Sequence, residues 1–205
     1  MVKSTDQKTI GLRETKSREL RSRIAKEGLR LFGSRGYDET KLETVAEAAG
    51  VAPRTLYHYF KTKYEILLFF HDDSFVTAID PMISLLPVGW GPFRIARECL
   101  LELVPRYETK TMVATYRIWN STDALIAQKQ LMFLQIEETI FSSLQKIWPL
   151  SENTARLRLA SMVATAALRL AMESSRREMV ERPVKVRLKE TFETLENLIT
   201  SSSAA

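Results

Sequence analysis

Residues 42–60 read LETVAEAAGVAPRTLYHYF, two short apolar-patterned segments with one glycine between them. Ala46 offers the small side chain that a second helix needs if it is to cross closely. Gly50 falls in the turn, where we expect a positive φ angle. The positions expected to be buried between the segments are Val45, Ala49, Val51, Leu56 and either Tyr59 or Phe60. The pattern predicts a helix-turn-helix, the unit whose second helix can enter the major groove of DNA.

The second of these predicted helices carries polar and aromatic side chains on its outward side, and two lysines follow it. Small residues around a glycine would suit an ordinary hairpin of two helices equally well. An outward set that packs poorly but suits phosphates and base edges favours DNA recognition instead. The outward residues are Pro53, Arg54, Thr55, Tyr57 and His58, followed by Lys61 and Lys63.

Two capping signals frame this unit. Residues 40–43 (Thr-Lys-Leu-Glu) match a capping box, in which a threonine hydroxyl and a glutamate carboxylate satisfy the free N–H groups at a helix start. Residues 62–65 (Thr-Lys-Tyr-Glu) match a second one, which predicts a helix that continues to about Ala78. Pro53 suits the first turn of the helix between these boxes.

The rest of the chain also reads as helix, with prolines and glycines at the boundaries. A first helix is expected from about Arg18 to Gly36, and residues 80–92, which hold three prolines and two glycines, predict a loop. Further helices are expected at about 92–104, 106–119, 121–147, 151–180 and 184–200. We therefore predict an all-α fold of about nine helices.

The expected organisation has four parts. Residues 1–17 form a flexible basic N-terminal arm, and residues 18–64 form a three-helix DNA-binding domain with the helix-turn-helix. Residues 65–200 form a helical-bundle domain for ligand binding and dimerisation. Residues 201–205 form a disordered tail.

The excess positive charge lies at one end of the chain. Residues 1–70 carry 14 Lys and Arg against nine Asp and Glu, whereas residues 71–205 carry 16 of each sign. This asymmetry suggests that the N-terminal third meets a polyanion such as double-stranded DNA. A solvated surface with a modest charge excess would give the same numbers.

The composition bounds the compartment. Cys99 is the single cysteine, so no internal disulfide can form. The first residues are polar and charged, without the apolar core of a signal peptide. No run of about 18 apolar residues occurs. We therefore expect a cytoplasmic protein without a membrane partner.

Positions spread from Arg21 to Leu68 resemble the TetR family of transcriptional regulators. The matching residues are Ile24 and Ala25, Leu31 and Phe32, Gly36 and Tyr37, Thr40, Val45 and Ala46, Ala49 to Val51, Thr55 to Tyr57, Tyr59 and Phe60, Lys63 and Glu65. The resemblance implies a three-helix DNA-binding domain whose third helix reads the groove. It also implies a divergent all-α domain for ligand binding and dimerisation.

The resemblance and the outward face together assign the DNA contacts. Thr55 and Tyr57 match family positions that touch DNA, and Lys63 matches a phosphate contact. We expect base reading by Pro53, Arg54, Thr55 and His58. Phosphate contacts are expected from Thr40, Lys41, Tyr57, Lys61 and Lys63.

Two positions depart from the family pattern. Position 54 is often glycine and is arginine here, and arginine can read guanine with two hydrogen bonds. Position 52 is often a capping serine and is alanine here, a loss of about 1 kcal/mol. Pro53 offsets part of that loss because its φ angle suits a helix start.

Large, soft side chains are dense between residues 82 and 172. Most must belong to the core, but a subset suits an adaptable apolar pocket. Residues 120–125 and 166–173 also loosely resemble the family members described as binding acyl-CoA-like ligands. The candidates for a pocket around an unidentified effector are Trp90, Phe93, Met112, Arg117, Trp119, Phe133, Met162 and Arg169, with the two arginines available for an anionic head.

The last two long helices predict a homodimer. Small residues recur on the first of them, so a partner helix could approach closely, and apolar residues recur on the second. A two-fold dimer implies a palindromic operator. The expected interface residues are Ala160, Ala164, Ala167, Ala171, Leu188, Phe192 and Leu195.

Signals of an enzyme or a metal site are weak. His71 stands beside Asp72 and Asp73, but adjacent helical residues point in different directions, so we expect no metal there. No nucleophile elbow or glycine-rich phosphate loop occurs. We expect no catalysis and no cofactor. The favoured function is a repressor released from its operator by a hydrophobic or amphipathic ligand; the alternatives are a DNA-binding dimer without such a ligand, and an enzyme.

Overall fold

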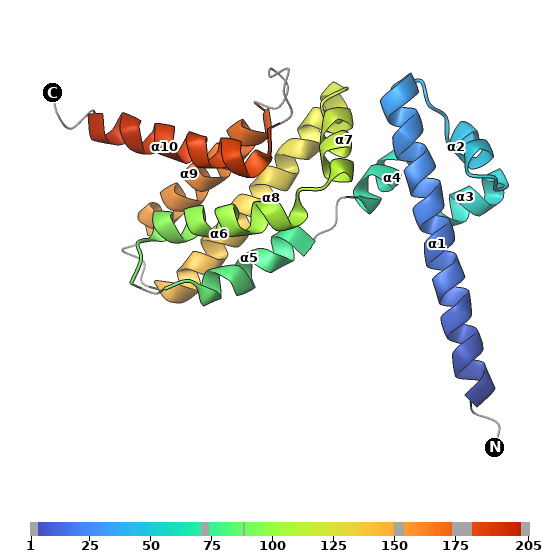
Figure 1. Ribbon diagram of the computed structural model, residues 1–205, viewed down its shortest axis with the longest axis horizontal. Helices are drawn as coiled ribbons and strands as arrows, with labels where there is room; N and C mark the ends of the chain where they lie inside the picture. Colours follow the sequence, from blue (N-terminus) through green and yellow to red (C-terminus); the bar gives the residue numbers. More distant parts are fainter. Residues whose placement is uncertain (1–3, 71–73, 88, 150–153, 174–181, 202–205) are drawn as a thin grey trace. The chain divides into compact units, whose positions relative to one another are not determined.

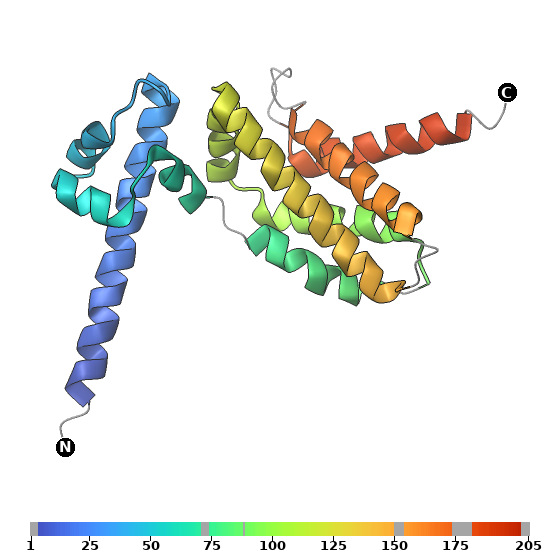
Figure 2. The ribbon, with the colours of Figure 1, turned by 180° about the vertical axis from the view of Figure 1, so that it is seen from behind.

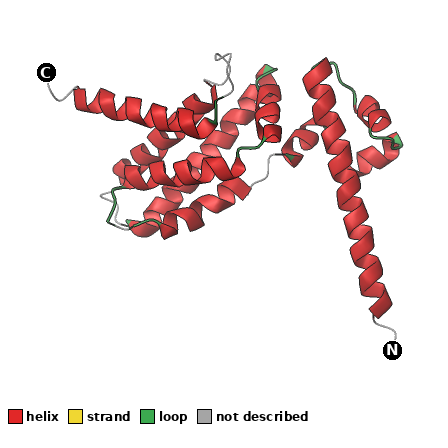
Figure 3. Cartoon of the chain, in the orientation of Figure 1, coloured by secondary structure: helices red, strands yellow, loops and turns green. Residues whose placement is uncertain are grey.

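The computed structural model describes residues 4–70, 74–87, 89–149, 154–173 and 182–201 (Figure 1). All regular structure in these residues is helical, and Figure 3 shows no strand among them. The helices are α1 (Ser4–Arg35), α2 (Leu42–Ala48), α3 (Pro53–Tyr59), α4 (Lys63–Phe69), α5 (Ser74–Leu85), α6 (Pro92–Tyr107), α7 (Lys110–Trp119), α8 (Asp123–Ile147), α9 (Thr154–Glu173) and α10 (Val184–Ser201). The predicted all-α class is confirmed, with ten described helices in place of about nine.

Several helix ends differ from the expected ones. The first helix begins at Ser4, so most of the expected arm is helical. The helix expected from Thr62 to Ala78 is two helices, α4 and α5. Residues 71–73, 174–180 and 202–205 lie outside the described residues, and with them the His71 cluster, the expected end of the helix at 151–180 and most of the tail.

Two prolines stand inside helices that were expected to stop at them. Pro81 lies within α5 and Pro105 within α6. An interior proline costs about 3 kcal/mol because it removes one backbone donor and crowds the preceding turn. In α5 that cost is offset by burial of the neighbours Ile79, Met82 and Ile83.

The chain divides into two compact units. The first comprises Met1–Asp72 and Lys110–Ile126, and the second comprises Asp73–Thr109 and Ala127–Ala205. The boundary expected between residues 64 and 65 therefore does not match this division, because α7 packs against α1 in the first unit.

The core of the first unit is built on α1. Ile24, Ala25, Leu31 and Phe32 of this helix are buried together with apolar residues of α2, α3 and α4. Gly28 permits the closest approach: a Cβ atom there would lie 2.7 Å from Cγ2 of the fully buried Ile66 in α4.

The second unit is a helical bundle in which α6 packs most extensively against α9, α9 against α10 and α5 against α6. The helix α8 runs along the side that Figure 2 shows in front. It is tied to α5 by Asp80, whose Oδ1 accepts hydrogen bonds from Ser143 (2.8 Å) and Lys146 (2.7 Å).

The bundle corrects the expected dimer interface. Six of the seven residues assigned to it are buried within the single chain: Ala160, Ala164, Ala167, Ala171, Leu188 and Phe192. The small face of α9 serves close packing against α6 and α10 rather than against a partner. The seventh, Leu195, is half-buried.

Candidate DNA-binding site

The helix-turn-helix is formed by α2, a short turn and α3. Gly50 has a φ of +64°, as the sequence predicted, and its N–H donates to the Glu47 carbonyl at 3.0 Å. The next N–H, of Val51, donates to the Ala46 carbonyl at 3.0 Å. A side chain at position 50 would strain this turn, because L-residues rarely adopt such a φ. Glycine therefore fixes the angle at which α3 leaves α2.

The expected base-reading residues lie on or near the surface of α3. Pro53, Arg54 and His58 are exposed, and Thr55 is half-buried. Pro53 stands in the first turn, and the N-cap residue Ala52 makes no side-chain cap, as its sequence predicted. The inner face is closed by Leu56, which is fully buried. This helix thus presents a guanidinium and an imidazole, one turn apart, to solvent.

Thr40 is not available to a phosphate. It is 1% exposed, and its hydroxyl donates to the Gly36 carbonyl at 2.7 Å. Gly36 has a φ of +98°, which turns the chain after α1 so that this carbonyl lies within reach. Lys41, and not Thr40, is the N-cap of α2, without a side-chain cap, so the first capping box does not form. The buried and bonded hydroxyl does not support the phosphate contact expected for Thr40.

Lys63 is engaged by the chain itself. Its Nζ donates to the carbonyls of Tyr37 (2.6 Å) and Asp38 (3.2 Å) and lies 4.6 Å from the centre of the Tyr37 ring. These contacts hold the turn between α1 and α2. The structure therefore gives Lys63 a role in that turn. The phosphate contact implied by the resemblance stays a prediction.

Lys41 and Lys61 are exposed, as phosphate contacts require. Lys61 Nζ donates to the Tyr57 carbonyl at 2.6 Å, at the C-terminal end of α3. A cation at this end also suits the helix dipole. Both ammonium groups remain accessible to a polyanion.

The Tyr57 hydroxyl contacts Glu43, which was expected only to cap the start of a helix. Its hydroxyl donates to Glu43 Oε1 at 2.7 Å, and both side chains are exposed. This hydrogen bond lowers the pKa of Glu43 and raises the pKa of Tyr57. The two residues are 14 positions apart, so only the crossing of α2 and α3 brings them together.

The second capping box forms in a modified way. Thr62 accepts a hydrogen bond from the Glu65 N–H at 3.2 Å, as predicted. The Glu65 carboxylate reaches past Thr62 and accepts from the Lys61 N–H at 2.7 Å. These two hydrogen bonds fix the bend between α3 and α4. They thereby also hold the last turn of α3 in place.

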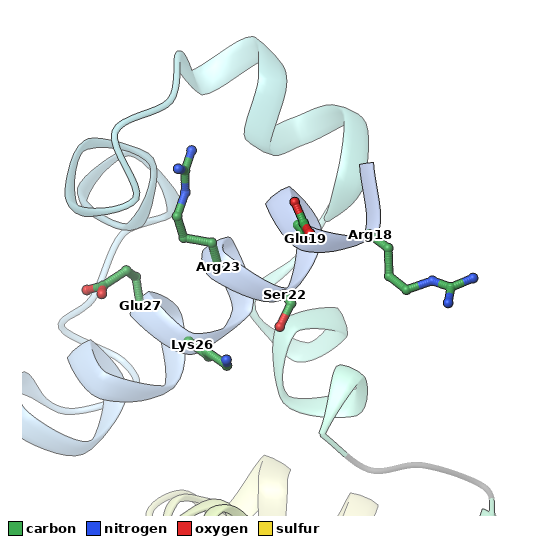
Figure 4. A pocket seen from close by; sticks show the side chains of 6 residues that line it. All are labelled: Arg18, Glu19, Ser22, Arg23, Lys26 and Glu27. Carbon is green, nitrogen blue, oxygen red and sulfur yellow. The ribbon is translucent and has the colours of Figure 1, made fainter. Parts of the chain in front are cut away.

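An open pocket of about 470 Å³ lies along α1 (Figure 4). Its lining is polar and charged and consists of Arg18, Glu19, Ser22, Arg23, Lys26 and Glu27. This surface differs from the apolar cavity expected for an effector.

The expected effector residues are divided between the two units. Trp119 is buried in the first unit with its ring against Tyr64 (5.5 Å between centres), while Arg117 is exposed. Met162 is also exposed, on the outside of α9.

Four of the remaining candidates, Trp90, Phe93, Phe133 and Arg169, lie in the second unit. The Arg169 guanidinium lies 5.3 Å from the centre of the buried Phe133 ring. Phe93 packs against Phe192, and Trp90 is half-buried beneath Arg94. The side chain of Met112 lies outside the described residues.

No group of three or more His, Cys, Asp or Glu side chains among the described residues could hold a metal ion. None of the described helices combines the length and the apolar character that a membrane crossing requires.

The exposed polar face of α3 and the glycine-fixed turn define a helix-turn-helix DNA-binding domain. Residues 24–68 match the family model described as bacterial regulatory proteins, tetR family. These residues therefore match the DNA-binding domain of the TetR family, and the resemblance seen between Arg21 and Leu68 is confirmed.

Individual relatives support this assignment. The chain is similar to the HTH-type transcriptional regulator TcmR of Streptomyces glaucescens, with 36% identity over 87 residues. That match covers 41% of this chain and 37% of the relative, so the chain aligns with little more than a third of the relative's length.

Solved structures extend the likeness to the fold of most of the chain. A transcriptional regulator from Aquifex aeolicus has a TM-score of 0.55 at 16% identity, covering 87% of this chain and 99% of that one. FadR of Thermus thermophilus, a TetR-family repressor solved with lauroyl-CoA, has a TM-score of 0.50 at 22% identity, covering 86% and 93%. At these identities the likeness shows the fold alone.

Proposed function

We propose that the chain is a sequence-specific transcriptional regulator that binds a palindromic operator as a homodimer and represses until a hydrophobic or amphipathic ligand releases it. The observation that carries this proposal is the exposed pair of Arg54 and His58 on α3 of a TetR-family helix-turn-helix. Arginine at such a position can read guanine through two hydrogen bonds. Lys41 and Lys61 supply phosphate contacts on either side of this helix.

A second copy of the chain is the partner that the proposal requires, because one helix-turn-helix contacts too few bases to be selective. A surface for it is the outer face of α9, where Leu159, Met162, Ala166 and Leu170 are exposed at spacings of three and four residues. We call these four residues the α9 stripe. An exposed apolar row of this length is typical of an interaction site.

The neighbouring helix α8 extends this surface. Leu131 and Leu134 are both more than half exposed, and the next residue on their face is Glu138, which pairs with Arg158 of α9 at 2.6 Å. The ion pair places this face of α8 beside α9. An apolar centre with charges at its border is the usual anatomy of a protein interface.

An anionic amphipathic effector is supported by polar groups inside the second unit. Thr165 is fully buried, and its hydroxyl has no hydrogen-bond partner among the described residues; within the same residues, the buried Arg169 Nε has none either. They stand one turn apart on α9, and Arg169 lies over Phe133. Buried donors of this kind suit the head group of a ligand whose chain lies against apolar residues. The lauroyl-CoA bound by the Thermus repressor belongs to that chemical class.

A titration with a long-chain acyl-CoA tests the effector. We expect lauroyl-CoA to raise the melting temperature and to release the protein from a duplex selected against it, whereas coenzyme A alone does neither. Arg169→Met should weaken both effects and leave DNA affinity unchanged. A protein that binds its selected duplex but responds to no member of a hydrophobic library would be the DNA-binding dimer without ligand.

A further inference from the structure

The hydroxyl of Tyr57 has one proton to donate, and it already donates that proton in a hydrogen bond to Glu43. The bond is 2.7 Å long, and its acceptor is an exposed carboxylate. Hydrogen bonds to ionised acceptors are roughly twice as strong as those between neutral groups. A DNA phosphate is another anionic acceptor. It could take the same proton only if the bond to Glu43 broke.

We propose that Glu43 keeps the Tyr57 hydroxyl from DNA phosphates and thereby weakens binding to non-operator sequences more than binding to the operator. The inference rests on the proposed function and names a specificity-determining residue within the same site. Exchange of one anionic acceptor for another yields little net energy, and it leaves the Glu43 carboxylate close to a phosphate of like charge. On an operator, base contacts such as those of Arg54 hold α3 in place, and Tyr57 stays bonded to Glu43. On other DNA, binding depends on phosphate contacts alone, so the loss of the Tyr57 contact weakens it more.

The bond contributes little to holding α2 against α3. Those helices are joined through the buried side chains of Val45 and Leu56 and through the hydrogen bonds of the Gly50 turn. A hydrogen bond between exposed side chains adds about 1 kcal/mol or less. The carboxylate instead lies 2.7 Å from the hydroxyl that would donate to a phosphate. Its position therefore affects binding more than folding.

The chain offers a matched control in Glu47. This residue is exposed on the same helix, four positions after Glu43, and carries the same charge. Glu47→Ala removes one negative charge from α2 without touching Tyr57. If Glu43→Ala changes DNA affinity more than Glu47→Ala does, the additional change therefore comes from loss of the Glu43–Tyr57 hydrogen bond and not from net charge.

The test measures the dissociation constants of four variants and the wild type by fluorescence anisotropy at one fixed salt concentration. The variants are Glu43→Ala, Glu47→Ala, Tyr57→Phe and the double variant Glu43→Ala with Tyr57→Phe. The probes are a duplex selected from a random library by the wild type and an unselected random-sequence duplex of equal length. Circular dichroism melts confirm that each variant is folded.

Glu43→Ala should tighten binding to the unselected duplex by about tenfold and to the selected duplex by about threefold or less, whereas Glu47→Ala tightens both equally. Tyr57→Phe should change little in the wild type but should reverse most of the gain in the Glu43→Ala background. Equal effects of Glu43→Ala and Glu47→Ala, or an equal effect of Tyr57→Phe in both backgrounds, would overturn the inference. A wild type that selects no sequence would overturn the proposed function as well, so the two failures are distinguishable.

Discussion

Arg54 stands where the TetR-family pattern often has glycine, and it is exposed on α3. We predict that Arg54→Ala weakens binding to the selected operator by about 1–3 kcal/mol and relaxes base preference at one position of each half-site, because a bidentate contact to guanine is lost. Competition with single-base operator variants measures the preference. If Arg54→Ala weakened all sequences equally, Arg54 would contact phosphate and not a base.

Replacement of Lys63 should change the stability of the protein, whereas replacement of Lys61 should change the salt dependence of DNA binding. We predict that Lys63→Met lowers the free energy of unfolding by about 1 kcal/mol, because the carbonyls of Tyr37 and Asp38 lose their charged donor. Lys61→Met should instead reduce the slope of log affinity against log salt by about one. Urea unfolding and salt titrations measure the two quantities. A reduced salt slope with unchanged stability for Lys63→Met would restore its phosphate role.

The sequence predicted the exposed residues of α3 better than the contacts around it. Arg54 and His58 could be placed because burial of Leu56 fixes the outward side of a helix by periodicity alone. Thr40 and Lys63 could not, because their partners are backbone carbonyls of the turn after α1. The position of those carbonyls follows from the φ of Gly36, and no residue pattern encodes it. Glu43 was missed for the same reason, since its partner belongs to another helix.

At the scale of the helices, we expect alanine substitutions at two glycines of α1 to have opposite effects on stability. Gly28→Ala should destabilise the first unit by about 1–3 kcal/mol, because its Cβ would meet the stiff, buried Ile66 and force α1 from α4. Gly33→Ala meets nothing within 4 Å and should stabilise the same helix by about 0.5–1 kcal/mol. Urea midpoints measure both. Equal shifts in the two variants would contradict the close approach of α1 and α4.

The link between α5 and α8 predicts a dependence on pH. Hydrogen bonds from Lys146 and then Ser143 lower the pKa of Asp80 below its ordinary value of 3.8. A lowered pKa gives stability that is present above the unfolded pKa and is lost as the pH falls through the folded one. Asp80→Asn should therefore destabilise the protein at pH 7, and the difference from wild type should shrink as the pH falls below about 4. A constant difference across chemical unfolding from pH 7 to pH 3 would show that Asp80 does not act through its charge.

Helix existence was predictable, but helix ends were not. The segments of α2 and α3 could be placed from periodicity and from Gly50 and Pro53, and α8 falls within the expected range 121–147. Pro81 and Pro105 were expected outside helices but lie within α5 and α6, because burial of their neighbours outweighs the local cost of a proline. No proline or glycine lies between α4 and α5, so the sequence gives no signal that one helix ends and another begins.

At the scale of the whole molecule, α9 shows what the sequence leaves open. This helix has a small face, Ala160 to Ala171, and a larger apolar face, the α9 stripe, which is displaced from it by about one residue. Periodicity finds both faces but not which of them is covered by α6 and α10. The small face is the buried one, because small side chains let three helix backbones approach closely.

The dimer proposal can be tested on the α9 stripe. We predict that Leu159→Asp with Leu170→Asp converts a dimer of twice 23.5 kDa into a folded monomer with weak DNA binding. Leu198→Asp replaces an equally exposed leucine of α10, outside the α9 stripe, and should leave the dimer intact. Ala164→Asp should unfold the chain, since this residue is fully buried. Light scattering measures the mass, and a monomeric wild type would contradict the proposal.

Selection of duplex DNA from a random library by the full chain tests the central claim most directly, which is that paired copies of α3 read DNA sequence. The account predicts enrichment of an inverted repeat whose half-site centres lie about one helical turn, or a multiple of it, apart. Enrichment of no common sequence, or of a single unrepeated site, would contradict it.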